Sequence, residues 1–256
     1  MAQADDGVET LERGNVYFFY RPRVEEEDPE GRSDVQNLYM VLSPHGKKEF
    51  RLALIGREEL PDPEAGGRRR YWGFVTEVER DPKKIVHELG PEEYETKTRG
   101  ERHQPAARPA GEGVYRVLRH DDHTLLVYAL ELPESPGEVQ RDLGIEAEAS
   151  YILSIKNPEG PSPARAGLPE NREAEFPKRL QEVFRGRKFS EADPPDFLGY
   201  AGCEFVLIAA SGDVEEELGL ALEPQEEELS TAEVFNDLRA ERSKQPVEPL
   251  LEGTWA

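Results

Sequence analysis

The 256-residue chain has a single cysteine, Cys203, which excludes an internal disulfide and a metal site built from several cysteines. Long apolar runs are also missing. The longest, Phe205 to Ala210, has six residues, whereas a membrane-spanning helix needs about 18. Basic charge is scarce, because 32 Lys and Arg residues face 54 Asp and Glu residues, for a net charge of -22. This deficit argues against binding to nucleic acid or to an anionic membrane, since both depend on basic surface.

Hydrophobic residues make up only 36% of the chain, which predicts a small hydrophobic core. The acidity has two interpretations that the sequence does not separate. One is adaptation to a saline cytoplasm, where salt screens the repulsion between like charges. The other is a GC-rich genome in which Arg codons displace Lys codons. The first seven residues are polar and acidic, which does not fit a secretory signal, so we expect a cytoplasmic protein.

Familiar catalytic patterns are absent as well. The chain has no Gly-x-Ser-x-Gly elbow, no phosphate-binding glycine-rich loop and no His-Glu-x-x-His segment. Cys203 stands at the start of the apolar segment 204–210, which predicts a buried strand in which the thiol serves as a small apolar side chain. The sequence therefore gives no catalytic constellation, and we expect no cofactor.

An internal likeness is the most informative feature that is present. Residues 71–78 and 125–132 are apolar and aromatic runs with an acid at the seventh position, and they stand 54 residues apart. Each continues into a polar segment that ends in Leu-Gly and then reaches a tyrosine. A weaker third copy begins at residues 16–24. The tyrosines at equivalent points, Tyr39, Tyr94 and Tyr151, are better explained by packing at a strand edge than by catalysis.

From this likeness we predict an α+β fold with a mainly antiparallel or mixed sheet, built from duplicated β-α-β-like units with short helices. The expected core covers 1–212 as one domain, with units at about 14–61, 68–111 and 114–168, followed by 176–212. Short helices are expected over 136–144 and 176–187, each stopped by a glycine. Residues 213–256 are expected to form an acidic, partly helical, poorly packed tail with a helix over 231–242.

Three segments carry a resemblance to a known group of proteins. They are residues 17–23 (Tyr-Phe-Phe-Tyr-Arg-Pro-Arg), residues 98–103 (Thr-Arg-Gly-Glu-Arg-His) and residues 151–158 (Tyr-Ile-Leu-Ser-Ile-Lys-Asn-Pro). With these segments the chain resembles a family of uncharacterised bacterial proteins over nearly its whole length. The resemblance implies no activity, cofactor or site.

The middle of the chain is the first candidate site, because it is locally basic. Between Arg68 and His120, twelve Lys and Arg residues face nine Asp and Glu residues. Guanidinium groups around a glycine suit a carboxylate or phosphate ligand. The predicted ligand-binding residues are Lys97, Arg99, Gly100, Arg102 and Arg108. If the copies share one sheet, these residues would converge with the basic loops at Lys47, Lys48 and Lys156. The alternative is that these residues are ordinary surface partners of neighbouring glutamates.

A second candidate is the run His120, Asp121, Asp122 and His123, whose nitrogen and oxygen atoms suit a divalent metal. Asp-Asp between two β segments is also common hairpin-turn chemistry, and alternate strand residues point to opposite faces. We therefore predict a turn and no metal site. The third candidate is the end of the chain, where Leu250, Leu251 and Trp255 would either anchor the tail in a partner's groove or cover the chain's own core.

Taken together, we expect a binding or interaction protein without catalytic activity. Its partner would be an anionic small molecule at the basic segment or a protein at the tail. The alternative is a hydrolase or transferase acting on a phosphorylated or carboxylated small molecule, in which His103 or His120 moves the proton. A flat, salt-bridged surface at the basic segment favours binding, and a concave pocket with a histidine at its centre favours the enzyme.

Overall fold

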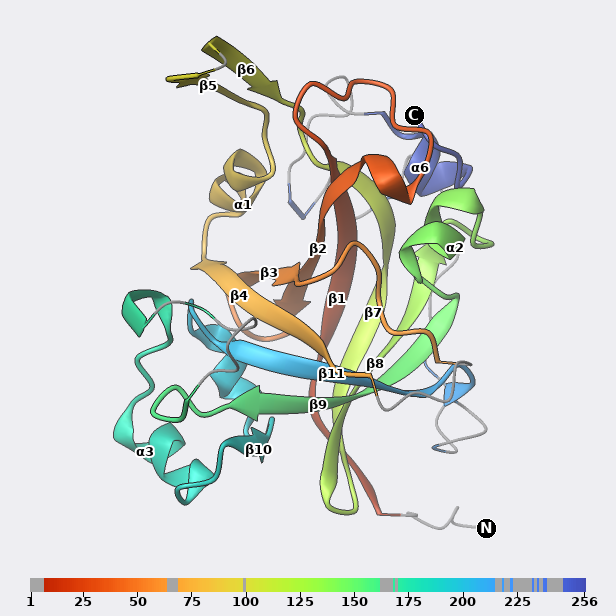
Figure 1. Ribbon diagram of the computed structural model, residues 1–256. Coiled ribbons are helices and arrows are strands. Elements are labelled where there is room, and N and C mark those ends of the chain that lie inside the picture. Colours follow the sequence, from red (N-terminus) through yellow and green to blue (C-terminus); the bar gives the residue numbers. More distant parts are fainter. Residues whose placement is uncertain are drawn as a thin grey trace.

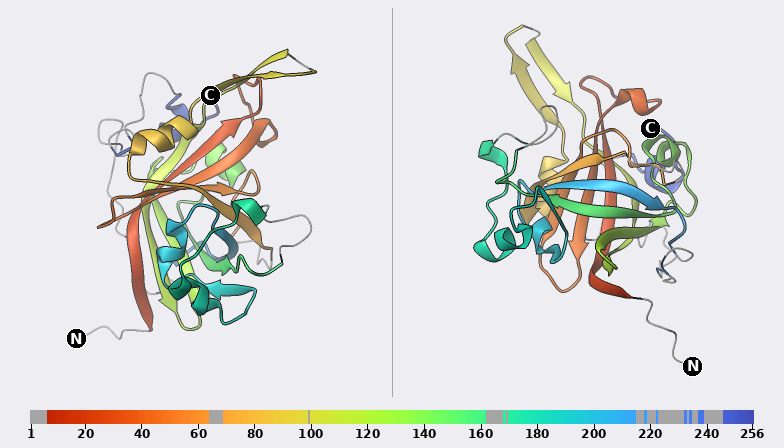
Figure 2. Two further views of the ribbon diagram at one scale, coloured as in Figure 1. Left: turned by 90° about the vertical axis from the view of Figure 1, so that its left-hand side faces the viewer. Right: turned by 60° about the horizontal axis from the view of Figure 1, so that its bottom comes forward.

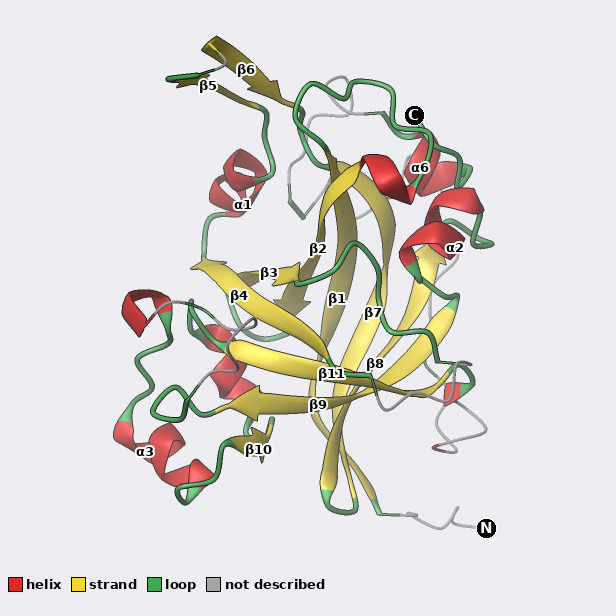
Figure 3. Cartoon of the chain, viewed as in Figure 1, coloured by secondary structure: helices red, strands yellow, loops and turns green. Residues whose placement is uncertain are grey.

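The computed structural model describes residues 7–63, 69–98, 100–161, 168, 170–214, 218, 222, 232, 234, 237–238 and 246–256. Within them, eight antiparallel strands close into a β-barrel (Figure 1, Figure 3). The order around the barrel is β9-β11-β4-β3-β2-β1-β7-β8, and pairing of β8 with β9 closes it. The strands are β1 (Val8–Pro22), β2 (Val35–Pro44), β3 (Phe50–Ile55), β4 (Tyr71–Glu79), β7 (Arg108–His120), β8 (His123–Leu132), β9 (Glu148–Lys156) and β11 (Glu204–Ser211).

The remaining elements stand outside the barrel wall. The short β10 (Phe189–Glu191) pairs with the end of β9, and β5 (Glu92–Thr96) pairs with β6 (Gly100–Gln104) as a separate hairpin. The α-helices are α1 (Pro82–Glu88), α2 (Glu138–Leu143), α3 (Lys178–Gln181) and α6 (Glu248–Leu251). The 3-10 helices are η1 (Arg32–Asp34), η2 (Glu170–Arg172), η3 (Glu182–Phe184) and η4 (Pro195–Gly199). No described helix combines the length and the apolar character needed to cross a lipid bilayer.

The predicted α+β fold with duplicated β-α-β-like units is wrong. The two likeness segments do have the same local order, β4-α1-β5 and β8-α2-β9, but their paths differ. Strand β9 returns to pair with β8 inside the barrel, whereas β5 leaves the barrel to pair with β6. The reason lies in the side chains. Strand β9 buries Tyr151, Leu153 and Ile155, whereas β5 has one apolar side chain, Tyr94, and nothing else to bury.

Several local predictions are confirmed. Helix α2 ends at Gly144, whose φ of 67° is the left-handed conformation that stops a helix. The segment predicted as a helix over 176–187 contains α3 and η3, and Gly186 follows with a φ of 75°. The predicted buried strand 204–210 is β11. The predicted helix over 231–242 lies mostly outside the described residues.

Side chains fill the inside of the barrel. Alternate residues of each strand point inward, such as Val16, Phe18 and Tyr20 of β1, and they form one buried cluster. Side chains of α2, α3 and η4 extend this cluster beyond the strands. An interior cavity between Met40, Val75 and Leu198 holds about 10 Å³, which is about the space of one water molecule.

Many described residues after 213 are buried against the barrel, so the prediction of a poorly packed tail is wrong for them. Val214, Leu218 and Leu222 share a buried cluster with residues of β7 and β8. Ala232, Val234, Leu238 and Leu250 join a second cluster with residues of β1, β2 and β3. The domain boundary placed at residue 213 stays a prediction, but the described residues beyond it contribute to the same packed unit.

Candidate functional site

The basic segment lies in the β5–β6 hairpin and at the start of β7. Arg99 lies outside the described residues, and Lys97 and Gly100 are exposed near the turn of the hairpin. Arg102 Nε is 3.1 Å from Glu25 Oε1, and His103 Nε2 is 3.1 Å from Glu27 Oε1. The turn at residues 25–27 therefore already supplies acidic partners to this segment.

Arg108 contacts the same turn from the start of β7. It is buried and donates from Nη2 to the backbone oxygen of Glu27 at 2.6 Å. The predicted meeting with the other basic loops does not occur. Lys47 Nζ pairs with Glu12 at 2.9 Å and with Asp196 at 3.1 Å, and Lys156 is buried elsewhere. The loops stay apart because the β5–β6 hairpin leaves the barrel while β9 remains in it.

The His120–His123 segment is the turn between β7 and β8. His120 and His123 are cross-strand partners, and Asp121 has a φ of 51° in the two-residue turn. Among the described residues no group of three or more His, Cys, Asp or Glu side chains has the arrangement of a metal site. His103 and His120 stand at opposite ends of the β6–β7 segment, so the structure does not bring the two proposed proton carriers together.

Cys203 is fully buried, as predicted, and burial raises the pKa of its thiol. The three tyrosines of the repeat occupy three different environments: Tyr39 is half-buried on the outside of the barrel, Tyr94 is exposed, and Tyr151 is inside the barrel. Their recurrence therefore reflects no shared packing site.

The predicted tail anchors contact the chain itself. Leu250 is fully buried against the outer face of the barrel and Leu251 packs beside it half-buried. The ring of Trp255 lies 5.1 Å from the ring of Tyr20 in an edge-to-face arrangement. The sequence left open whether these residues bind a partner or cover the chain's own core. The contacts in the structure correspond to the second alternative.

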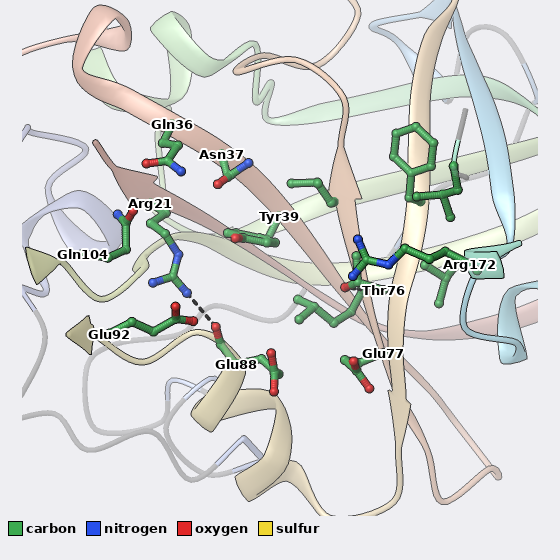
Figure 4. A pocket seen from close by; sticks show the side chains of 16 residues that line it. Arg21, Gln36, Asn37, Tyr39, Thr76, Glu77, Glu88, Glu92, Gln104 and Arg172 are labelled. Carbon is green, nitrogen blue, oxygen red and sulfur yellow. Dashed lines mark hydrogen bonds between the residues drawn. The ribbon is translucent and has the colours of Figure 1, made fainter. Parts of the chain in front are cut away.

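A groove on the outside of the barrel is the strongest candidate site, and sequence analysis did not find it. It runs across the outer faces of β2, β3 and β4, has a volume of about 550 Å³, and is seen from close by in Figure 4. This volume lies in the range of small-ligand and peptide-side-chain sites. One wall comes from α1 and the base of the β5–β6 hairpin, and the other from the segment around Leu168 and Arg172.

The floor of the groove is apolar and aromatic. Tyr39, Leu54 and Phe74 project outward because they alternate with inward-facing neighbours on β2, β3 and β4. Trp72 stacks beside Phe74, with ring centroids 6.5 Å apart and planes at 18°. Half-buried aromatic side chains on an outer strand face form a surface that a ligand's apolar part can cover.

The walls of the groove carry charges of opposite sign. Glu77 and Glu88 lie below Tyr39 in Figure 4, Glu92 lies on the hairpin side, and Arg172 reaches in from η2. Burial, together with the charges of Glu88 and Glu79, raises the pKa of Glu77 above the usual value of a glutamate. The negative charges of Glu77 and Glu88 therefore oppose each other. The exposed Arg172 has no hydrogen-bond or ion-pair partner within the described part of the chain.

Arg21 fixes the wall on the hairpin side. Its guanidinium is buried and donates to the backbone oxygens of Glu88, Gly90 and Pro105 at 2.6, 2.8 and 3.0 Å. Its Cζ also lies 5.8 Å from the centre of the Tyr39 ring. Arg21 therefore joins the end of α1 to the chain before β7, and it holds the acidic wall in position.

Lys156 fixes the opposite wall. This buried ammonium lies 2.7 Å from a carboxylate oxygen of Glu173 and 2.7 Å from one of Glu204. Glu204 also accepts a hydrogen bond from the backbone of Leu168. Gly202, with a φ of 82°, allows the close approach, because a Cβ there would lie 2.3 Å from the backbone oxygen of Arg172.

The polar groups of the groove are carboxylates, amides, guanidinium groups and hydroxyls. No His, Cys or Ser is present among the residues that line the groove in the described structure, and the Thr76 hydroxyl donates to the backbone oxygen of Leu52 at 3.2 Å. No protein-family model matches this chain, and no curated protein or solved structure is detectably similar to it.

Proposed function

We propose that this protein is a non-catalytic binding protein and that its outer groove recognises a ligand with a positively charged group attached to an apolar body. The observation that carries the proposal is the combination of the acidic pair Glu77 and Glu88 with the apolar floor at Tyr39 and Phe74. An amine or guanidine between the two carboxylates would relieve their mutual repulsion. The apolar body of the ligand would cover the floor and remove it from water.

The floor adds a second attraction for a positive group. The face of an aromatic ring such as Phe74 attracts cations within about 6 Å of the ring centre. Arg172, on the other wall, offers donors to a carbonyl or carboxylate oxygen of the same ligand. The groove thus suits a dipolar ligand whose cation points to Glu77 and Glu88.

An anionic ligand at the basic segment is not part of this proposal. Arg102 already pairs with Glu25, and Arg108 donates to a backbone oxygen of the same turn. A ligand anion there would have to displace these partners and approach a chain of net charge -22.

The test uses three small probes that differ only in their head group: 4-phenylbutylamine, 4-phenylbutyrate and 4-phenylbutanamide. The chain has two tryptophans, and a Trp255→Phe background leaves Trp72, beside the groove, as the fluorescent reporter. We expect the amine to change the Trp72 emission at lower concentration than the amide, and the butyrate to bind most weakly.

The expected loss of amine binding in Glu77→Gln/Glu88→Gln is about tenfold or more, since each lost charged partner removes on the order of 1 kcal/mol or more. The matched control, Glu134→Gln/Glu159→Gln, removes the same charge from exposed positions outside the groove and should bind as the wild type does. Equal binding of amine and butyrate, or unchanged amine binding by Glu77→Gln/Glu88→Gln, would overturn the proposal.

A further inference from the structure

The β5–β6 hairpin projects away from the barrel and has no core of its own. Figure 2 shows it extending beyond the barrel in both views. It is a two-stranded sheet in which β5 has β6 as its strand partner, and its side chains are almost all polar. A two-stranded hairpin in water is marginally stable by itself, so this arm contributes little to the stability of the fold.

One face of this hairpin continues the groove. Glu92 and Gln104 line the groove, and they are cross-strand partners at the base of the hairpin. Side chains two residues further along a strand point to the same face, so the next pair on this face is Tyr94 and Arg102. Tyr94 lies about 7 Å beyond Glu92, at about 3.4 Å per residue.

Tyr94 is the large hydrophobic side chain that the described structure leaves exposed, at 41%. Its ring has no aromatic or cation contact within the described residues. Tyrosine is favoured at binding surfaces because it buries much apolar area and keeps a polar end in water. A ring held on an arm at the end of a groove is thus placed to contact a ligand that extends out of the groove.

Amide side chains lie between the groove and the hairpin. Gln36 and Asn37 of β2 line this end, and neither side-chain amide has a hydrogen-bond partner within the described part of the chain. Each primary amide offers a donor and an acceptor, which is also what a peptide unit offers. An extended backbone crossing this end of the groove would find both kinds of partner.

We infer that the ligand of the groove is a polypeptide segment in extended conformation, with a Lys or Arg side chain between Glu77 and Glu88 and with a further residue packed on Tyr94. The inference rests on the proposed function and adds to it the class of the ligand. Tyr94 is not among the residues that line the groove, so a ligand confined to the groove does not contact its ring. Nucleic acid is disfavoured by the acidic wall, and a second copy of this chain by its own net charge of -22.

The experiment selects binders from a displayed library of random 12-residue peptides on the full-length protein. We expect the selected peptides to be enriched in Lys or Arg and to lose affinity about tenfold or more in Tyr94→Ser, which corresponds to removal of one aromatic anchor. 4-Phenylbutylamine should bind Tyr94→Ser as it binds the wild type, because this probe occupies only the groove. The control Glu95→Gln changes the opposite face of the same strand and should keep peptide affinity within about threefold.

The two proposals fail in different ways. Peptides that lose affinity in Glu77→Gln/Glu88→Gln but not in Tyr94→Ser would overturn the polypeptide path over the hairpin and leave the groove function in place. Recovery of no peptide above background would overturn the inference as well, while amine binding would still test the groove. Peptides that are insensitive to Glu77→Gln/Glu88→Gln would contradict both proposals. Circular dichroism of Tyr94→Ser should match the wild type, since the ring is exposed.

Discussion

Arg51 and Glu12 form a two-point ion pair inside the barrel. Arg51 Nη1 lies 2.7 Å from Glu12 Oε1, and Arg51 Nη2 lies 3.0 Å from Glu12 Oε2. The Tyr115 hydroxyl donates to Glu12 Oε1 at 3.0 Å, and Lys47 Nζ donates to Oε2 at 2.9 Å. Burial works to lower the pKa of Arg51, but the charge and hydrogen bonds of Glu12 outweigh it and raise this pKa. Both oxygens of the Glu12 carboxylate thus accept hydrogen bonds, which offsets the free-energy cost of burying its charge.

Glu12→Gln is expected to destabilise the protein by about 3–5 kcal/mol, because the buried Arg51 loses the charge of its two-point partner. Arg51 then keeps only the more exposed Glu49, at 2.8 Å, as an ion-pair partner in the described structure. Urea unfolding at pH 7 measures this free energy. The control, Glu9→Gln, removes an exposed partner of Arg119 and should cost less than about 1 kcal/mol. In Glu12→Gln/Arg51→Met the loss should be smaller than the sum of the two single losses. Additive losses would show that the two residues do not stabilise each other.

Lys156→Met is expected to cost about 3–5 kcal/mol in free energy of unfolding, since Glu173 and Glu204 keep their charges without the ammonium. Burial works to lower the pKa of Lys156, but hydrogen bonds to the two glutamates outweigh it and raise this pKa above 10.5. The stabilisation is therefore fully present below pH 10.5 and is lost as the pH rises through the raised pKa. The difference between wild type and Lys156→Met should shrink in strongly alkaline solution.

The control for Lys156→Met is Lys178→Met, which removes an ammonium whose side chain is 90% exposed and 3.7 Å from Glu182. It should change the free energy of unfolding by less than about 0.5 kcal/mol at any pH. Amide exchange offers a second measurement. The Ala174 N–H, bonded to the Gly202 oxygen at 3.1 Å, should exchange faster in Lys156→Met because the groove wall loosens. Unchanged exchange there would contradict the role assigned to Lys156.

Glu77→Gln is expected to stabilise the free protein at neutral pH while it weakens the binding of 4-phenylbutylamine. Burial and the charges of Glu88 and Glu79 raise the pKa of Glu77, so its ionised form opposes folding. The contribution of Glu77 to stability is full below the unfolded value near 4.5 and is lost as the pH rises through the raised pKa. Wild type and Glu77→Gln should therefore converge in stability in acid, as followed by thermal unfolding from pH 4 to 8.

Amine binding should show the opposite trend with pH. Protonation of Glu77 removes an attraction for the amine, so wild-type affinity should fall as the pH falls through the raised pKa. Glu77→Gln should show a weaker dependence over the same range. If wild type and variant lose affinity in parallel, a different group controls binding.

Leu250→Ala is expected to lower the free energy of unfolding by about 2–5 kcal/mol, because Leu250 is fully buried in the outer cluster and its helix α6 packs against β7. Leu251→Ala, at a half-buried neighbour, should cost distinctly less. If the end of the chain were a tethered ligand for another protein, Leu250→Ala would leave the stability unchanged.

The segments of the barrel were predictable where short-range pattern decides them. Residues 204–210 are apolar and bounded by glycines, and they form β11. Gly144 and Gly186 take the left-handed conformation that ends α2 and follows η3. Asp121 and Asp122 make the turn that their residue types favour. In each case the preference is set by the residues themselves and by their nearest neighbours along the chain.

The same patterns gave a wrong prediction for the pairing of segments that are far apart in the chain. The likeness between 71–94 and 125–151 is a likeness of local elements, and it says nothing of which strand each segment pairs with. The acidic β5 cannot add to the core, so it leaves the barrel, while the apolar β9 closes the barrel against β8. The groove could not be predicted from the sequence for a related reason. Its residues come from distant segments and share no motif, as with Tyr39, Glu77, Glu88 and Arg172.

The amino-acid order by itself determined the charge of -22, the places of many strands and turns, and the buried state of Cys203. It did so because these properties follow from composition and from preferences that act over a few residues. Only the tertiary structure decided that the sheet closes, that Lys156 is held between Glu173 and Glu204, and that Tyr94 stands beside the groove. These outcomes depend on pairing between segments far apart in the chain. Many strand arrangements satisfy the same local preferences, and the packing of the complete core selects one of these arrangements.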